Sequence, residues 1–165
     1  MRHGGRSKRE ALRDAIQFET DGREFFLEAA RKTVDYFGRI IFNSLADEEL
    51  GHIERIRAID RSLRDTGQWP RSNTPTPEEG KNVFQEALMQ MDETVRDRTD
   101  DLQAVKVALE LERKGYHFYS GLAAKAIEPR EKEFYGRLAA EEQRHLQILE
   151  DTWRALIERG SSTIE

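Results

Sequence analysis

Two short stretches of the chain each place a glutamate and a histidine three positions apart. The first pair is Glu49 and His52, and the second is Glu142 and His145. Both stretches have the periodicity of a helix, and residues three apart on a helix share a face, so each pair can bind one metal ion. Each pair also falls within the apolar stripe of its helix, where an ionisable group needs a partner. The pattern predicts metal binding inside a protein core.

The two pairs belong to a longer internal repeat. An offset of 93 positions separates His52 from His145, and the same offset carries Glu19 onto Glu112. Duplication of a helical hairpin is the simplest account. Each hairpin then contributes one isolated glutamate from its first helix and one Glu-x-x-His pair from its second, which is a ligand set for two metal ions in a four-helix bundle.

Six ionisable side chains should therefore meet at the middle of the bundle: Glu19, Glu49, His52, Glu112, Glu142 and His145. Removing one unpaired carboxylate from water costs several kcal/mol, whereas the whole fold is stabilised by about 5–15 kcal/mol. Four buried carboxylates need protons or cations, and two divalent cations balance their charge. Mixed carboxylate and imidazole ligands suit iron or manganese, with zinc as a possible substitute.

The composition narrows the class of protein. Charged residues make up 36% and apolar residues 37% of the chain, as in amphipathic helices with charged outer faces. A net charge of −5 argues against nucleic acid as a partner, and the absence of cysteine excludes disulfides, zinc–thiolate sites, iron–sulfur clusters and thiol nucleophiles. No apolar run approaches the ~18 residues of a membrane span. The start of the chain lacks the apolar stretch of a secretory signal, so we expect a cytoplasmic protein.

The sequence predicts an all-α fold with a single domain. Residues 1–7 form a disordered lead, and the domain covers 8–160. It consists of a hairpin at 8–65, a crossover at 66–98 and a second hairpin at 99–160. The prolines of the crossover interrupt helical structure, but a short amphipathic helix is expected to begin at Pro77.

Individual residues mark the expected helix boundaries. A break near 36–38 separates the first two helices, and Gly67 ends the second because glycine tolerates the left-handed conformation. Asp100 is expected to cap the third helix, which runs to about Ile127. Pro129 marks the start of the fourth helix, which ends near Gly160.

Three further residues, Glu48, Glu141 and Tyr119, are expected to influence the site without belonging to the six. Glu48 and Glu141 lie at the margin of the apolar stripes, which favours a supporting role over metal binding. Tyr119 lies two turns beyond Glu112 and could donate a hydrogen bond to a ligand carboxylate. Its counterpart in the first hairpin, Phe26, cannot, so the surroundings of the site are expected to be asymmetric.

Two glycines follow the isolated glutamates by three residues, Gly22 after Glu19 and Gly115 after Glu112. They allow either close helix packing or space for a small oxidant beside the metals. His117 points away from the direction of Glu112 and is expected on the surface.

These motifs resemble the rubrerythrin branch of the ferritin-like superfamily over about residues 8–158. The matching motifs are Glu19-x-x-Gly22-x-x-Phe25-Phe26, Leu45-Ala46-x-Glu48-Glu49-x-x-His52, Glu112-x-x-Gly115-x-x-Phe118-Tyr119 and Leu138-Ala139-x-Glu141-Glu142-x-x-His145. The resemblance implies a ferritin-like four-helix bundle in which these six glutamates and histidines bind two iron ions, with Glu49 and Glu142 bridging. Two features differ from rubrerythrins proper. The chain has no cysteines for a rubredoxin-like domain, and Gly115 stands where they carry an additional glutamate.

The leading expectation is a di-iron oxidoreductase that reacts with hydrogen peroxide or dioxygen through the same six residues. Electrons would come from a separate donor protein, and the resemblance suggests a homodimer. Three alternatives remain: binding and oxidation of ferrous iron for storage or detoxification, manganese catalase-like activity, and a bundle that only tolerates a structural metal.

Overall fold

The structure is a computed structural model that describes residues 7–71, 87 and 99–161. Four long helices make up most of these residues. They are α1 (Lys8–Lys32), α2 (Tyr36–Thr66), α4 (Thr99–Lys125) and α5 (Pro129–Ser161). All four were predicted, with ends that agree within a few residues. Most of the predicted crossover, including its short helix, lies outside the described residues. The structure describes only residues 66–71 and Ala87 of this segment. No helix of the described part combines the length and apolar character of a membrane-spanning segment.

Short polar side chains start the first two helices. The Ser7 hydroxyl accepts a hydrogen bond from the backbone N–H of Glu10, whose carboxylate accepts one from the Ser7 N–H in return. Asp35 caps α2 by accepting hydrogen bonds from two backbone N–H groups. Gly67 ends α2 with φ +68°, as predicted, because this left-handed conformation is strained for other residues.

The prediction that Asp100 caps the third helix is wrong. Helix α4 already includes Thr99, the residue before Asp100, so Asp100 lies within its first turn. A carboxylate there still interacts favourably with the unpaired N–H groups at the helix N-terminus.

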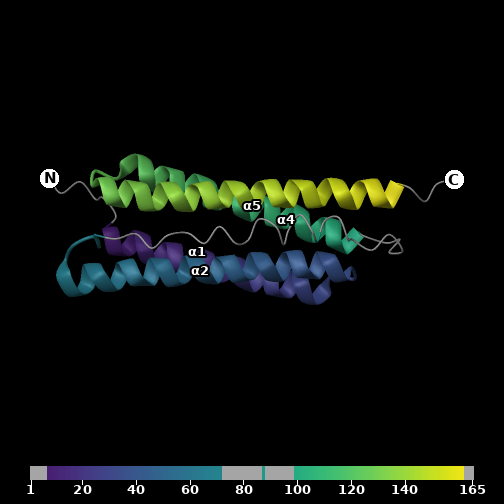
Figure 1. The fold of residues 1–165 in the computed structure, drawn as a ribbon, viewed down its shortest axis with the longest axis horizontal. Helices are drawn as coiled ribbons and strands as arrows, with labels where there is room; N and C mark the ends of the chain where they lie inside the picture. Colours follow the sequence, from purple (N-terminus) through teal and green to yellow (C-terminus); the bar gives the residue numbers. More distant parts are fainter. Residues whose placement is uncertain (1–6, 72–86, 88–98, 162–165) are drawn as a thin grey trace.

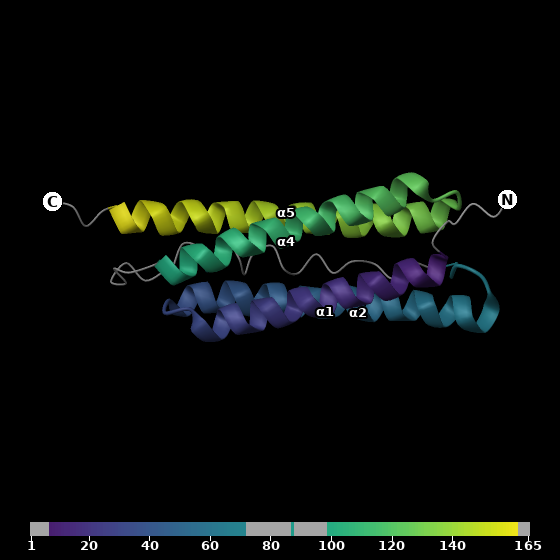
Figure 2. The same cartoon turned by 180° about the vertical axis from the view of Figure 1, so that it is seen from behind.

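The helices form two hairpins that lie side by side along the long axis of the molecule. Helix α1 packs along α2, and α4 packs along α5. Figure 1 shows the purple and blue hairpin beneath the green and yellow one, and Figure 2 shows the same pairing from behind. Contacts of α1 with α4 and of α2 with α5 join the hairpins into one four-helix bundle.

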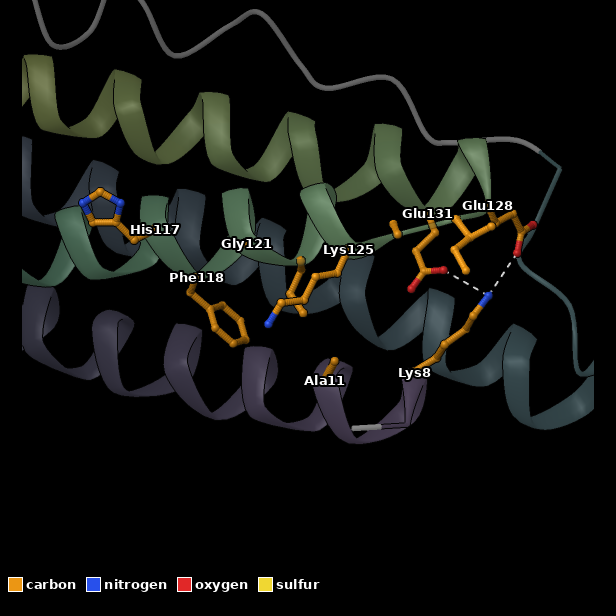
Figure 3. Close-up of a pocket in the computed structure, with 11 residues that line it drawn as sticks. Lys8, Ala11, His117, Phe118, Gly121, Lys125, Glu128 and Glu131 are labelled. Carbon is orange, nitrogen blue, oxygen red and sulfur yellow. Dashed lines mark hydrogen bonds and ion pairs between the residues drawn. The ribbon is translucent and has the colours of Figure 1, made fainter. Parts of the chain in front are cut away.

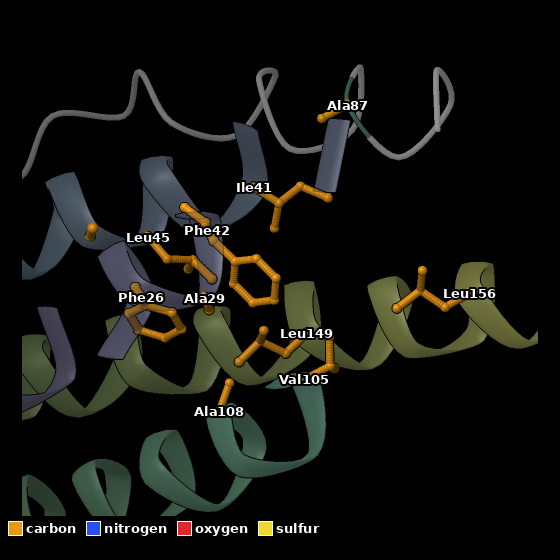
Figure 4. Packing of buried hydrophobic residues seen from close by; sticks show 12 residues of the cluster. Phe26, Ala29, Ile41, Phe42, Leu45, Ala87, Val105, Ala108, Leu149 and Leu156 are labelled. Atoms are coloured by element: carbon orange, nitrogen blue, oxygen red, sulfur yellow. The ribbon is translucent and has the colours of Figure 1, made fainter. Parts of the chain in front are cut away.

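Two apolar clusters fill the bundle on either side of its middle. One is centred on Phe26, Phe42 and Leu149 (Figure 4). The other contains Leu12 and Tyr119. Along α1, Glu19 comes after Leu12 and before Phe26, so the ionisable residues form a layer between two water-excluding regions.

Candidate metal centre

All six predicted side chains come together in this middle layer. Their exposed fractions are at most 3%: Glu19 0%, Glu49 2%, His52 1%, Glu112 3%, Glu142 0% and His145 0%. Each of the four helices contributes, since α1 and α4 carry one glutamate each and α2 and α5 carry one Glu-x-x-His pair each. The convergence that the duplication predicted is therefore present, and metal ligation by the six residues stays a prediction.

The layer divides into two overlapping groups of possible metal ligands. One consists of Glu19, Glu49, His52 and Glu142, and the other of Glu49, Glu112, Glu142 and His145. Within each group the ligand atoms all lie within 4.8 Å of one another. Glu49 and Glu142 belong to both groups, so their carboxylates are placed to bridge two ions.

The two imidazole rings have matching orientations. Nδ1 of His52 lies 3.1 Å from Glu19 Oε2, and Nδ1 of His145 lies 3.3 Å from Glu112 Oε2. The other ring nitrogen, Nε2, lies 2.6 Å from Glu141 in His52 and 2.8 Å from Glu48 in His145. A ring that donates its Nε2–H to a carboxylate presents an unprotonated Nδ1 to a metal ion.

Glu48 and Glu141 thus support the histidines, as their marginal positions suggested. Each comes from the opposite hairpin to its histidine, and each also accepts hydrogen bonds from an arginine, Arg144 for Glu48 and Arg55 for Glu141. Sequence reasoning missed both arginines. Their positions are not related by the repeat, because the equivalents of Arg55 and Arg144 are Ile148 and Gly51. The duplicated pattern therefore carried no signal for them.

We expect Glu141→Gln to weaken metal binding. The neutral amide lacks the negative charge of the carboxylate that accepts the hydrogen bond from His52 Nε2–H. Loss of such a hydrogen-bond partner behind a metal-binding histidine reduces metal affinity by about 10–100-fold. Isothermal titration with Zn²⁺ measures the change. Glu133→Gln is the matched control, because Glu133 lies on the same helix but pairs with Arg137 at the surface. Equal affinities for the two variants would contradict the role of Glu141.

The ionisable groups strongly perturb one another in the absence of metal. Burial, reinforced by the charges of neighbouring glutamates, raises the pKa values of Glu49 and Glu142 well above 4.5. Burial lowers the pKa of His52, but the charge of Glu19 and hydrogen bonds with glutamates outweigh it, so that the pKa rises well above 6.5. His145 behaves likewise beside Glu112.

Glu19 shifts in the opposite direction. Burial raises its pKa, but the positive charge of His52 and hydrogen bonds, including one from Tyr119, lower it to about 2. The raised pKa values of Glu49, Glu142, His52 and His145 favour protons on these groups, which offset the buried negative charge, and metal binding must displace them.

Some oxygens of the shared carboxylates lack hydrogen-bond donors among the described residues. These buried atoms are Glu49 Oε1 and both oxygens of Glu142. Histidine Nδ1 atoms lie 3.3 Å from Glu49 Oε1 and 3.4 Å from Glu142 Oε1, at the distance of an ion pair. Buried carboxylate oxygens without donors are costly, and two divalent cations would satisfy them. The donor set therefore fits a pair of metal ions.

Tyr119 donates a hydrogen bond to Glu19 Oε1, across the two hairpins. The predicted hydrogen bond from Tyr119 to one of the six clustered carboxylates is present, and the role of that carboxylate as a metal ligand stays a prediction. Because the counterpart of Tyr119 is Phe26, no equivalent bond reaches Glu112, and the asymmetry expected from the sequence is present.

The two glycines make room for the shared carboxylates. A Cβ atom at Gly22 would lie 3.3 Å from Glu49 Oε2. A Cβ atom at Gly115 would lie 3.0 Å from Glu142 Oε2 and 2.9 Å from a ring carbon of Phe18. Close packing is thus the main reason for glycine at both positions, and the space beside them is occupied by the carboxylates of Glu49 and Glu142.

We expect Gly115→Ala to destabilise the protein and to displace Glu142. Overpacking of this kind costs about 1–3 kcal/mol, which exceeds the gain of up to about 1 kcal/mol from alanine in a helix. Gly51→Ala is the control, since a Cβ atom there meets nothing within 4 Å in the described structure and should be stabilising. Thermal unfolding and Zn²⁺ titration of both variants test this. Equal melting temperatures would contradict the packing argument.

A surface cavity of about 970 Å³ lies apart from this centre. It is lined by residues of α1, α4 and α5, and Lys8 forms ion pairs there with Glu128 and Glu131 (Figure 3). His117 also lines it and is exposed, as predicted. None of the six clustered residues lines this cavity.

Comparison with known proteins identifies the family and supports the fold. The family model described as Rubrerythrin matches residues 10–152. A solved structure, that of a hypothetical protein from Pyrococcus furiosus, superimposes with a TM-score of 0.68 and 23% sequence identity, over 92% of this chain and 91% of the other. At this identity the likeness concerns the fold. No curated protein matches the chain.

Proposed function

Because the chain belongs to the rubrerythrin family, we propose that it is a non-haem di-iron oxidoreductase that reacts with hydrogen peroxide or dioxygen. The observation that carries the proposal is the pair of overlapping buried groups that share Glu49 and Glu142. Glu49 and Glu142 would contribute to holding both ions, and an iron pair held in this way would supply two electrons to one small oxidant. A separate protein would restore the electrons.

The iron pair would supply redox electrons and Lewis acidity toward the oxygen atoms of the oxidant. The chain supplies the rest. Glu19, His52, Glu112 and His145 would each hold one ion, while the two apolar clusters exclude water from the layer between them. Tyr119 orients Glu19 through its hydrogen bond. Glu48 and Glu141 fix the imidazole rings from the opposite hairpin.

Anaerobic loading with Fe²⁺ followed by stopped-flow mixing with each oxidant tests the proposal. We expect two iron ions per chain and oxidation faster than that of free Fe²⁺ in the same buffer. Glu142→Gln is the control, because it alters both groups of ligands. Oxidation no faster than in buffer would contradict the proposal.

The same samples separate the other functions. Uptake of many iron ions per chain, measured by light scattering and metal analysis, would indicate iron storage. Oxygen evolution from hydrogen peroxide by the manganese-loaded protein would indicate a catalase. The homodimer and the identity of the electron donor stay predictions, which size-exclusion chromatography and reduction assays address.

A further inference from the structure

A row of three oxidisable aromatic side chains leads away from the candidate metal centre. Tyr119 contacts Glu19 through its hydroxyl. Its ring stacks on that of Tyr135 with a centroid separation of 6.3 Å and an interplanar angle of 19°. The ring of Tyr135 in turn lies 5.9 Å from that of Trp69. All three side chains are at most 3% exposed.

The first hairpin contains the same stacked pair without its hydroxyl groups. The repeat offset carries Phe26 onto Tyr119 and Phe42 onto Tyr135. The two phenylalanine rings (labelled in Figure 4) lie 6.4 Å apart at an angle of 26°, which closely matches the tyrosine pair. Phenylalanine therefore satisfies the packing at these positions, and packing does not account for the two phenols of the second hairpin.

Hydrogen bonding accounts for only one of these phenols. Tyr119 has Glu19 as its acceptor. The hydroxyl of Tyr135 and the indole N–H of Trp69 have no hydrogen-bond partner among the described residues, although both are buried. Burying a polar group without a partner is costly, so these side chains need a reason other than stability.

Trp69 lies just beneath the surface at the far end of the row. It follows Gly67, which ends α2, and its neighbours Gln68 and Arg71 are exposed. Its ring packs against Phe134 and Tyr135 near the start of α5. The row thus connects the buried metal layer with a solvent-exposed turn.

We propose that Tyr119, Tyr135 and Trp69 form a path for single electrons between the metal centre and this turn. The path rests on the proposed function, because its acceptor is the metal pair after oxidation by peroxide or dioxygen. Its role is to reduce an oxidised centre that has received no electrons from its usual donor.

The transfer balances in electrons and protons. Tyr119 gives one electron to the oxidised metal pair and its phenolic proton to Glu19 Oε1, which leaves a neutral tyrosyl radical. One electron then passes from Trp69 through the ring of Tyr135 to Tyr119, and the proton returns from Glu19. Trp69 becomes an indole radical cation, which can form without losing a proton. A one-electron reductant in solution, such as ascorbate, restores it.

Zinc-loaded protein tests the path without iron chemistry. The chain has two tryptophans, so in a Trp153→Phe background any tryptophan radical belongs to Trp69. Flash oxidation by a photo-excited ruthenium complex removes an electron from Trp69 first and so drives the path in the reverse direction. An electron then passes from Tyr119 to Trp69, and we expect the tryptophan radical to decay as a tyrosyl radical appears. Adding Tyr119→Phe should remove this tyrosyl signal and lengthen the life of the tryptophan radical. Tyr116→Phe replaces a tyrosine of the same helix that lies outside the row. It should change neither the tyrosyl signal nor the lifetime of the tryptophan radical.

Iron-loaded protein provides the second measurement. Freeze-quench electron paramagnetic resonance after addition of peroxide should show a tyrosyl radical that is lost in Tyr119→Phe, and mass spectrometry should find Trp69 oxidised in the wild type only. The path is refuted if Trp69 forms no radical in the zinc protein, or if Tyr119→Phe leaves the radical lifetimes unchanged. If the zinc protein behaves as expected but the iron is not oxidised by peroxide or dioxygen, the proposed function fails. Electron transfer among the three side chains is then established, but its role in reducing an oxidised metal pair is refuted. Circular dichroism confirms that each phenylalanine variant is folded.

Discussion

Glu142→Gln is expected to abolish stable binding of both metal ions. Its carboxylate belongs to both groups of ligands, so the substitution removes a charged ligand from each ion at once. The effect should exceed the ~10–100-fold loss of affinity that follows removal of an outer hydrogen-bond partner. Metal analysis after gel filtration, together with Zn²⁺ titration, measures it.

Glu19→Gln is the informative comparison, because Glu19 belongs to one group only. We expect this variant to retain one ion with near-normal affinity, bound by the group that contains His145. Glutamine is nearly the same size as glutamate and adds no charge to the buried layer, so both variants should fold without metal. Two tightly bound ions in Glu142→Gln would refute the shared bridging position.

Removing the metal ions near neutral pH is expected to lower the melting temperature. The melting temperature of the metal-free protein should fall further as the pH rises. Ligands that bind only the folded state stabilise it, so their removal is destabilising. For a chain of this size, each kcal/mol lost at the transition corresponds to about 2–4 °C. Calorimetry of the metal-loaded and chelated protein at a series of pH values measures both effects.

The direction of the pH effect follows from the shifted pKa values. Glu49 and Glu142 have folded-state pKa values well above the ordinary 4.5, and His52 has one well above 6.5. The folded protein therefore holds more protons than the unfolded chain between each ordinary and raised pKa. The resulting stabilisation is complete below the ordinary pKa and is lost as the pH rises through the raised one. Glu19, with a pKa of about 2, acts oppositely and only in acid.

Glu49→Gln should flatten this decline in the metal-free protein, because the variant has no proton to lose at that position. Glu133→Gln, at an exposed ion pair, should leave the decline unchanged. A melting temperature unaffected by chelation, or a metal-free protein that becomes more stable from neutral to alkaline pH, would contradict the convergence of these ionisable side chains.

The sequence by itself determined the bundle and the six residues at its centre. Helical periodicity placed Glu49 and His52 on an apolar face, and the constant offset identified Glu19 and Glu112, which no local motif marks. These are properties of single helices and of the repeat, so they can be read without knowing how the helices pack. The predicted start of the third helix at Asp100 was less accurate, because helix ends depend on local competition among neighbouring capping groups.

Only the tertiary structure decided which side chains meet across the two hairpins. Arg55 and Arg144 serve equivalent roles from positions that the repeat does not relate, and Tyr119 bonds to a glutamate 100 residues away. The row from Tyr119 to Trp69 likewise depends on how the turn after α2 packs against α5. Such contacts depend on the relative placement of helices, which many residues determine together, whereas the face on which a residue lies depends on its own helix alone.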